Sequence, residues 1–338
     1  MRIIFVTIFI LVVFLMPAFT TYSGGPNLFT SFTIEDQQKN FYIMNKDSRF
    51  YWFGGMLGGS SFRYDSLSGE FYEFDFNRGN TVESVSSIEI INDQVWFGLT
   101  TFGIAVYDLK KREFIFYGSN NGLNYYAYTD GEKYSKVTSI AFDEDTNKVW
   151  VGLIRAGLSY YDGQNNWGKV DNPLIRGISV YSIDTNKSIV VAAGDKGLYY
   201  LDKKRDKWYF GGNISDNTKL YHAFIDNNSI ICNATTNNKG QVLVYKIDEK
   251  QFNIVFEWKA PIDRLQKFKN YLVLASRYGV TFYNLNTKKH KTFNTSYGLP
   301  TNWVNYIYFD KEDMWVLTQK GICRAKIKDV LKELEDFN

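Results

Sequence analysis

Residues that commonly carry enzyme chemistry are scarce in this chain of 338 residues, which contains two histidines and two cysteines. His222 lies in an alternating apolar stretch and His290 lies in a lysine-rich turn. A structural zinc site needs about four clustered ligands, usually Cys and His, and neither histidine has a second one in its neighbourhood. We therefore expect His222 to be structural, and we expect no catalytic residues, no metal site and no cofactor.

An acidic segment at residues 143–147, Asp-Glu-Asp-Thr-Asn, resembles the start of a calcium loop. Such a loop needs Gly at its sixth position and Glu at its twelfth. This chain has Lys148 and Ile154 at those positions. The segment therefore predicts a hairpin turn and not a cation site.

A basic residue recurs in the turns that precede a repeated glycine. Five of these seven turns carry Lys or Arg and only one carries an acid. A ring of cations beside aromatic rings would suit an anionic or sugar-acid ligand, or an acidic partner surface. The alternative is that the cations keep hairpin tips soluble. The candidate binding residues in these turns are Phe102, Arg155, Lys196, Lys239, Arg277, Tyr278 and Lys320.

Three tyrosines add to this candidate surface. Tyr125, Tyr126 and Tyr128 lie within residues 120–130, where the longest spacing between repeated glycines has its extra length. Exposed tyrosines are enriched at interfaces. We therefore expect this loop to take part in recognition.

The elements that position these residues follow from a repeat. The repeated glycines stand at 59, 103, 157, 197, 240, 279 and 321, at spacings of 44, 54, 40, 43, 39 and 42 residues. Each copy has an alternating run, a polar turn, a nearly continuous apolar run, a glycine turn and two further strand patterns. This period and content are typical of four-stranded propeller blades. Residues 24–327 therefore predict an all-β, seven-bladed β-propeller.

Both ends of the repeat region carry distinct patterns. The last copy lacks an outer strand, and residues 28–34 match the outer-strand pattern, so we expect this N-terminal strand to close the ring. Residues 328–338 predict a short amphipathic C-terminal helix with Val330, Leu331, Leu334 and Phe337 on one face. Cys232 and Cys323 fall in copies five and seven, too far apart for the roughly 7 Å Cα separation of a disulfide. We expect two buried free thiols.

The first 23 residues have the pattern of a signal peptide. A single Arg2 is followed by an apolar run over residues 3–16 and then by small residues near Ser23. The alternative is a retained anchor, although the apolar run is shorter than the roughly 20 residues that span a bilayer. We expect export to the periplasm or the cell surface and no stable membrane span once the segment is cleaved.

The motif in three copies resembles the two-component-regulator propeller repeat family. Trp150-Val151-Gly152, Gly157-Leu158 and Tyr161-Asp162 carry the resemblance, and residues 298–302, Gly-Leu-Pro-Thr-Asn, match the segment before the next blade. The resemblance is strongest in the copies around Trp52, Trp96 and Trp150. It implies an exported seven-bladed propeller that binds a ligand. Family members often form the sensing half of membrane histidine kinases, a role that does not transfer because this sequence contains no kinase segment.

Charge and composition limit the function classes. The net charge of +3 comes from 39 basic and 36 acidic side chains with no basic stripe, so we expect no nucleic-acid partner. The first hypothesis is a non-enzymatic exported propeller that binds a carbohydrate or an envelope protein at its channel-mouth face, where the glycine turns and blade connections meet. The alternative is a structural subunit of an envelope assembly. A propeller lyase or hydrolase is disfavoured because histidines are few and no regular inner acidic cluster is evident.

Export is directly testable. The mature protein should begin near Gly24 and fractionate as exported soluble material, because the apolar run is short for a membrane span. N-terminal sequencing of protein purified from its native host checks this. Met1 or Arg2 retained in a membrane fraction would instead support an anchor.

Overall fold

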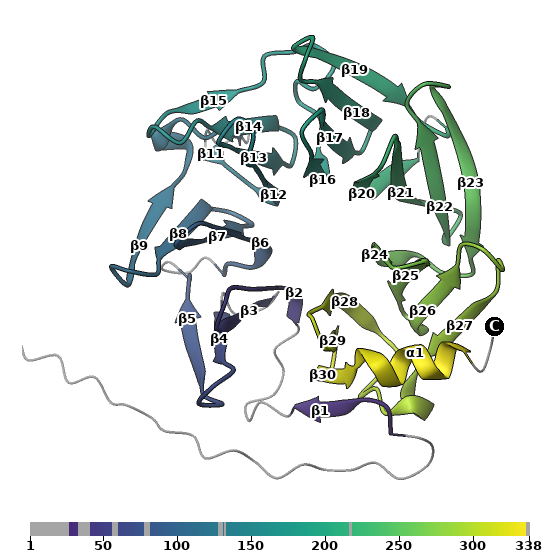
Figure 1. Ribbon diagram of the computed structural model, residues 1–338. Coiled ribbons are helices and arrows are strands. Elements are labelled where there is room, and N and C mark those ends of the chain that lie inside the picture. The colour runs from purple at the N-terminus through teal and green to yellow at the C-terminus, as the bar shows by residue number, and fades with distance from the viewer. Residues whose placement is uncertain are drawn as a thin grey trace, which may run out of the picture.

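The structure is a computed structural model that describes residues 27–32, 41–55, 60–77, 82–127, 131, 133–215 and 218–335. Seven four-stranded antiparallel sheets form a ring, with their innermost strands around a central channel (Figure 1). We number the sheets as blades 1–7 in the order of their innermost strands. The predicted all-β, seven-bladed fold is confirmed.

The first four blades follow the chain directly. Blade 1 contains β2 (Phe41–Lys46), β3 (Phe50–Gly55), β4 (Ser60–Asp65) and β5 (Phe71–Asp75). Blade 2 contains β6 (Val85–Ile91), β7 (Gln94–Leu99), β8 (Gly103–Asp108) and β9 (Glu113–Tyr117). Blade 3 contains β12 (Val137–Asp143), β13 (Lys148–Leu153), β14 (Gly157–Tyr161) and β15 (Trp167–Lys169). Blade 4 contains β16 (Val180–Thr185), β17 (Ile189–Gly194), β18 (Gly197–Asp202) and β19 (Lys207–Gly212).

The remaining blades complete the circle. Blade 5 contains β20 (Lys219–Asp226), β21 (Ser229–Thr236), β22 (Lys239–Lys246) and β23 (Gln251–Trp258). Blade 6 contains β24 (Ile262–Phe268), β25 (Tyr271–Ser276), β26 (Gly279–Asn284) and β27 (His290–Phe293). Blade 7 contains β28 (Val304–Phe309), β29 (Asp313–Thr318), β30 (Gly321–Lys326) and, outermost, β1 (Thr30–Phe32). Two short 3-10 turns, η1 (Ser119–Asn121) and η2 (Thr295–Tyr297), precede blades 3 and 7.

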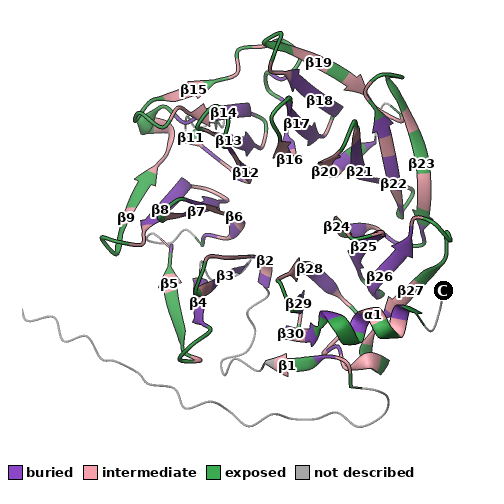
Figure 2. Ribbon diagram, in the orientation of Figure 1, coloured by how far each residue is buried: buried purple, intermediate pink, exposed green. Residues whose placement is uncertain are grey.

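Burial follows the strand order within each blade (Figure 2). The second strands, such as β7 and β17, are buried over nearly their whole length because neighbouring blades cover both of their faces. The outer strands β5 and β9 are exposed or half-buried throughout. This gradient explains why the apolar runs of the sequence mark the second strand of each blade.

The glycine of the Trp-x-Gly motif is explained by packing between blades. A Cβ atom at Gly54 would lie 2.6 Å from a Val85 side-chain methyl carbon, and one at Gly98 would lie 2.6 Å from the equivalent carbon of Val137. A side chain at either position would therefore push the next blade away. The glycine of this motif therefore permits close packing between neighbouring blades.

The repeated glycine in the next turn has a different role. Gly103 has φ +92° and Gly279 has φ +114°, a left-handed conformation that glycine adopts without strain. A Cβ atom at Gly279 would also lie 2.0 Å from the carbonyl oxygen of Phe293. These turns thus require glycine both for backbone conformation and for space.

The N-terminal strand closes the ring as predicted. β1 pairs antiparallel with β30, with Ser31 opposite Cys323. Phe29 beside this strand is buried, and its ring lies 6.2 Å from that of Phe293 in an edge-on arrangement. Blade 7 therefore joins the two ends of the propeller, and residues 33 and 34 of the predicted strand lie outside the described residues.

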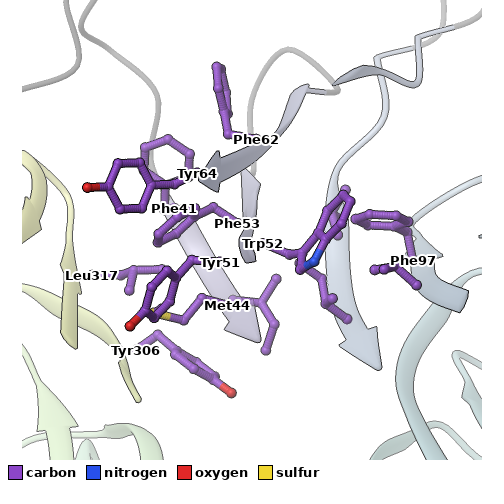
Figure 3. Close-up of a cluster of buried hydrophobic side chains, with 14 of the residues drawn as sticks. Phe41, Met44, Tyr51, Trp52, Phe53, Phe62, Tyr64, Phe97, Tyr306 and Leu317 are labelled. Carbon is purple, nitrogen blue, oxygen red and sulfur yellow. The ribbon is translucent and has the colours of Figure 1, made fainter. Parts of the chain in front are cut away.

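Blade 7 also packs directly on blade 1 (Figure 3). The Trp315 ring lies 4.6 Å from that of Tyr51, and Leu317 belongs to the same buried cluster. The cluster continues into blade 2 through Trp52, whose ring centroid is 5.9 Å from that of Phe97. The ends of the chain are thus joined both by strand pairing and by a continuous apolar core.

The predicted C-terminal helix is α1 (Ile327–Glu335), which packs beside β30. Val330 and Leu334 are buried and Leu331 is half-buried, as the amphipathic pattern predicts. Phe337 and the signal-peptide region lie outside the described residues. Within the described part of the chain, no helix has the length and hydrophobicity needed to span a membrane.

Ring closure can be tested by removing its strand. Deletion of residues 28–34 should lower the melting temperature of the whole protein, because β30 would become an exposed edge and the Phe29 contact would be lost. Phe29→Ala alone should cost about 3–5 kcal/mol of unfolding free energy. Phe210→Ala on outer strand β19, where the side chain is 50% exposed, is the matched control. Unchanged thermal melting of the deletion variant would refute the closure.

Candidate functional site

The recognition surface predicted from sequence corresponds to one face of the ring. In an antiparallel four-stranded blade, the turn between the second and third strands lies at the same end as the connection that enters the blade. Backbone bonds join these elements, since Thr100 N–H donates to Ser84 O at 3.1 Å and Gln319 N–H donates to Trp303 O at 3.2 Å. We call this end the channel-mouth face.

A cavity of about 740 Å³ occupies the channel and is lined by the innermost strands of the blades. Each of these strands has a register shift near its start, between positions such as Val85 and Ser87 or Ile262 and Arg264. Such bulges redirect a side chain and are frequent beside binding sites. The seven bulge residues are Tyr42, Ser86, Thr138, Tyr181, Tyr221, Asp263 and Asn305.

Aromatic side chains gather around the cavity. Tyr42, Tyr181 and Trp303 line it. The ring of Tyr221 stacks on that of Tyr181 with centroids 5.4 Å apart and an interplanar angle of 20°. The guanidinium of Arg277 lies 4.2 Å from the centroid of the Trp303 ring. Flat apolar faces and hydrogen-bonding groups therefore border the same opening.

Three carboxyl groups line the same cavity. Burial raises the pKa of Asp263 to about 6, although the nearby charge of Arg277 opposes this shift. Burial raises the pKa of Glu89 to about 7, and the charge of Asp184 raises it further. Burial also raises the pKa of Asp184. These inner-strand acids were not expected from the sequence, which showed no regular inner acidic cluster.

A histidine, an arginine and a tyrosine follow one another on the innermost strands of blades 5, 6 and 7. The predicted structural role of His222 has support in its bonding to Asn233, with Nδ1 3.2 Å from the Asn233 side-chain oxygen. The guanidinium of Arg264 donates a hydrogen bond to the Tyr306 hydroxyl at 3.3 Å and lies 4.6 Å from the ring centroid. All three side chains line the cavity as well.

The predicted cations occupy equivalent turns but surround the cavity at different distances. Arg277 reaches Trp303 at the cavity wall, whereas Lys196, Lys239 and Lys320 are exposed at the tips of their turns. Tyr278 is 43% exposed and stands 4.0 Å from the ammonium of Lys259. None of the described candidate residues lines the cavity itself.

The long loop before blade 3 lies on the channel-mouth face. It forms a small hairpin of β10 (Tyr126–Ala127) and β11 (Lys133–Tyr134). The guanidinium of Arg155 is 6.0 Å from the Tyr126 ring, and the ammonium of Lys133 is 4.8 Å from the Tyr125 ring. The structure thus brings these predicted residues together, and Tyr128 lies outside the described residues.

Phe102 lines a second cavity, which is separate from the central one. It is half-buried against the core, and its backbone N–H donates to the buried carboxylate of Glu83 at 3.1 Å. With Phe116 and Lys133 it lines a smaller cavity of about 240 Å³ beside the inserted hairpin. Phe102 therefore belongs to the border between blade 2 and the hairpin.

The remaining chemical candidates have structural roles. Cys232 and Cys323 are buried free thiols, as predicted, and burial raises the pKa of both. The acidic segment at 143–147 forms the turn from β12 to β13, where Asp143 pairs with Lys203 at 2.6 Å. His290, expected in a turn, begins strand β27 and packs edge-on against Trp258 at 5.6 Å. Among the described residues, no group of three or more His, Cys, Asp or Glu side chains could hold a metal ion.

The cavity-lining residues were missed because their signal is weak in a single copy. Tyr42, Tyr181, Asp263 and Arg264 occupy the second or third position of an inner strand, where blades 2 and 3 have Ser or Thr. An alignment of the seven copies at these two positions would have distinguished these residues from the Ser and Thr of blades 2 and 3. Their gathering around one cavity depends on ring closure.

Comparison with protein-family models and with curated proteins finds no match for this chain. Solved structures share its fold. The extracellular domain of the hybrid two-component system BT4673 from B. thetaiotaomicron superposes with a TM-score of 0.69 at 18% identity over 88% of this chain and 40% of that one. The corresponding domain of BT3049 from the same organism gives a TM-score of 0.69 at 14% identity over 89% of this chain and 42% of that one.

A further structural match is the computationally designed Ika8 protein, with a TM-score of 0.58 at 15% identity over 87% of this chain and 98% of the designed one. At such identities the likeness shows the fold alone. This chain spans about 40% of the length of the two extracellular domains. The comparisons therefore support a propeller of the kind found in those extracellular domains.

The cavity carboxyls predict a pH dependence of stability. A carboxyl whose pKa is higher in the folded protein binds more protons when folded, so stability falls as the pH rises between its unfolded and folded values. For Glu89 this window runs from the ordinary 4.5 to about 7, and its full effect is at most about 3 kcal/mol. The melting temperature should fall from pH 5 to pH 8, and Glu89→Gln should reduce that fall.

The matched control for this measurement is Glu113→Gln, which removes an exposed carboxyl from outer strand β9. It should leave the pH profile of thermal melting unchanged. Equal slopes for the wild type and Glu89→Gln would show that the Glu89 carboxyl is not perturbed in the folded protein.

Proposed function

We propose that this protein is an exported, non-enzymatic propeller that binds a carbohydrate at its channel-mouth face. The observation that carries the proposal is the combination at the 740 Å³ cavity of aromatic rings, such as Trp303 and Tyr181, with hydrogen-bonding side chains. Ligand sites are concave and largely apolar, with a few polar groups that fix orientation. Sugars offer apolar ring faces and a rim of hydroxyl groups, so they match this arrangement.

Two further observations support the proposal. The fold is shared with extracellular domains of signalling systems, which agrees with export and with a binding role. The Trp-x-Gly and Tyr-Asp motifs of blades 1–3 agree with membership of the two-component-regulator propeller repeat family. The same blades supply Tyr42 and the Tyr126–Arg155 contact at the face.

The experiment is a glycan array probed with the purified mature chain, followed by calorimetry on the glycans that bind. Trp303→Ala should weaken binding about tenfold or more, because a central aromatic contact contributes more than about 1.4 kcal/mol. Phe210→Ala on the rim should bind like the wild type. A pull-down from an envelope fraction runs in parallel, and a stoichiometric protein partner without glycan binding would favour the protein-binding or structural alternative.

The role of the predicted cations can be tested by the same binding measurement. Charge reversal by Arg155→Glu together with Arg277→Glu should weaken binding, and added salt should weaken the wild-type complex, because exposed charges are screened beyond about 10 Å at 0.1 M salt. The fold should survive, since exposed substitutions usually change stability by about 0.5 kcal/mol. Binding that is indifferent to both changes would assign these cations to solubility.

A further inference from the structure

The wall of the central cavity changes its chemistry between blades 4 and 5. At the position that directly follows the bulge residue, blades 2 and 3 place Ser87 opposite Gly98 and Ser139 opposite Gly152. Blade 5 instead places His222 opposite Asn233. Small residues suffice for blade packing at this position, so the larger polar ones in blade 5 and beyond indicate another use.

Blade 6 also has a larger polar residue at this position, Arg264, which pairs with Ala275 of the next strand. It is half-buried and lines the cavity, and its side chain contacts the neutral Tyr306. Among the described residues it forms no ion pair within 4.0 Å. A charged guanidinium in a partly enclosed cavity is costly without a counter-charge. The site therefore favours an anion supplied from outside.

None of the three cavity carboxyls lies within the ion-pair distance of 4.0 Å from the Arg264 guanidinium. Burial and then the charge of Asp184 raise the pKa of Glu89. The charge of Arg277 acts on Asp263, which neighbours Arg264 in sequence, and opposes the rise that burial causes in its pKa. The donors of Arg264 beyond its bond to Tyr306 are therefore available to a ligand.

His222 supplies an acceptor beside this donor. The side-chain nitrogen of Asn233 donates to the Ile262 carbonyl at 2.9 Å, so the Asn233 oxygen faces His222 and accepts from its Nδ1. The proton is thereby assigned to Nδ1, which leaves Nε2 as an acceptor. Burial and the charge of Arg264 lower the pKa of His222 to about 3, which keeps the ring neutral at physiological pH.

We propose that the ligand is an acidic sugar of the uronic-acid class, whose carboxylate binds Arg264 and Tyr306 while a neighbouring hydroxyl donates to His222 Nε2. A guanidinium and a phenolic O–H together match the oxygens of one carboxylate. A sugar acid presents that carboxylate next to hydroxyl groups, in line with the donor and acceptor placed side by side here. This inference rests on the proposed carbohydrate-binding function and specifies its ligand class.

The test is calorimetry of the mature chain with two acidic probes, trigalacturonic acid and a glucuronate-containing disaccharide, each paired with its neutral methyl ester. The wild type should bind at least one acid about tenfold or more tightly than its ester, because hydrogen bonds to charged groups contribute about 1.5–3 kcal/mol. Arg264→Met should bind acid and ester equally. Thermal melting establishes that the variant is folded.

The matched control is Lys267→Met. It removes one positive charge from the same strand β24, but Lys267 pairs with Asp226 at 2.7 Å and does not line the cavity. The preference for the acid should survive in this variant, which separates a local contact from an effect of net charge. His222→Phe should weaken the acid complex by removing the acceptor.

Several outcomes would overturn the inference. It is wrong if neither acid binds, if acid and ester bind the wild type equally, or if the preference survives Arg264→Met. A neutral glycan that binds with dependence on Trp303 but not on Arg264 would leave the carbohydrate-binding function in place and reject the acidic ligand. Absence of any glycan binding on the array would reject both.

Discussion

Close packing of each blade against the one before it determines the geometry of the whole ring. Val85 packs where a Cβ of Gly54 would lie, and Val137 does the same at Gly98. Serine side chains add bonds between adjacent inner strands, since Ser87 accepts from the Ile140 N–H at 3.0 Å and Ser139 accepts from the Ile183 N–H at 3.1 Å. This spacing between blades sets how the ring closes and so forms the cavity.

Some polar groups of the cavity lie at positions where the glycine contact between blades is not repeated. Asn233 stands where blades 2 and 3 have glycine, and its amide both holds His222 and donates to the Ile262 carbonyl of the next blade. One side chain thus substitutes for the close packing and orients a group in the channel. Variation within a repeat can therefore add a binding group while the contact between neighbouring blades is kept.

Burial then gives the channel its electrostatic character. The two carboxyls of Glu89 and Asp184 have raised pKa values, whereas Arg264 remains cationic because an arginine is protonated at any physiological pH. With a pKa of about 7, the Glu89 carboxyl is ionised only in part at neutral pH. A barely basic chain can in this way present a site suited to an anion.

The repeat, the blade number, the closing strand β1 and the C-terminal helix α1 could all be predicted from the sequence. This was possible because period-2 alternation and turn glycines such as Gly103 and Gly279 are local requirements, and their spacing is visible along the chain. The burial of Cys232 and Cys323 followed from their places in that repeat. Which side chains face the channel became visible in the folded ring and could not be predicted from the repeat. Strand bulges reorient Tyr42, Tyr181 and Asp263, and the packing of blade 6 against blade 7 sets Arg264 beside Tyr306, 42 residues away. A bulge is a matter of register between strands, and proximity across blades depends on packing, so neither is written in local spacing.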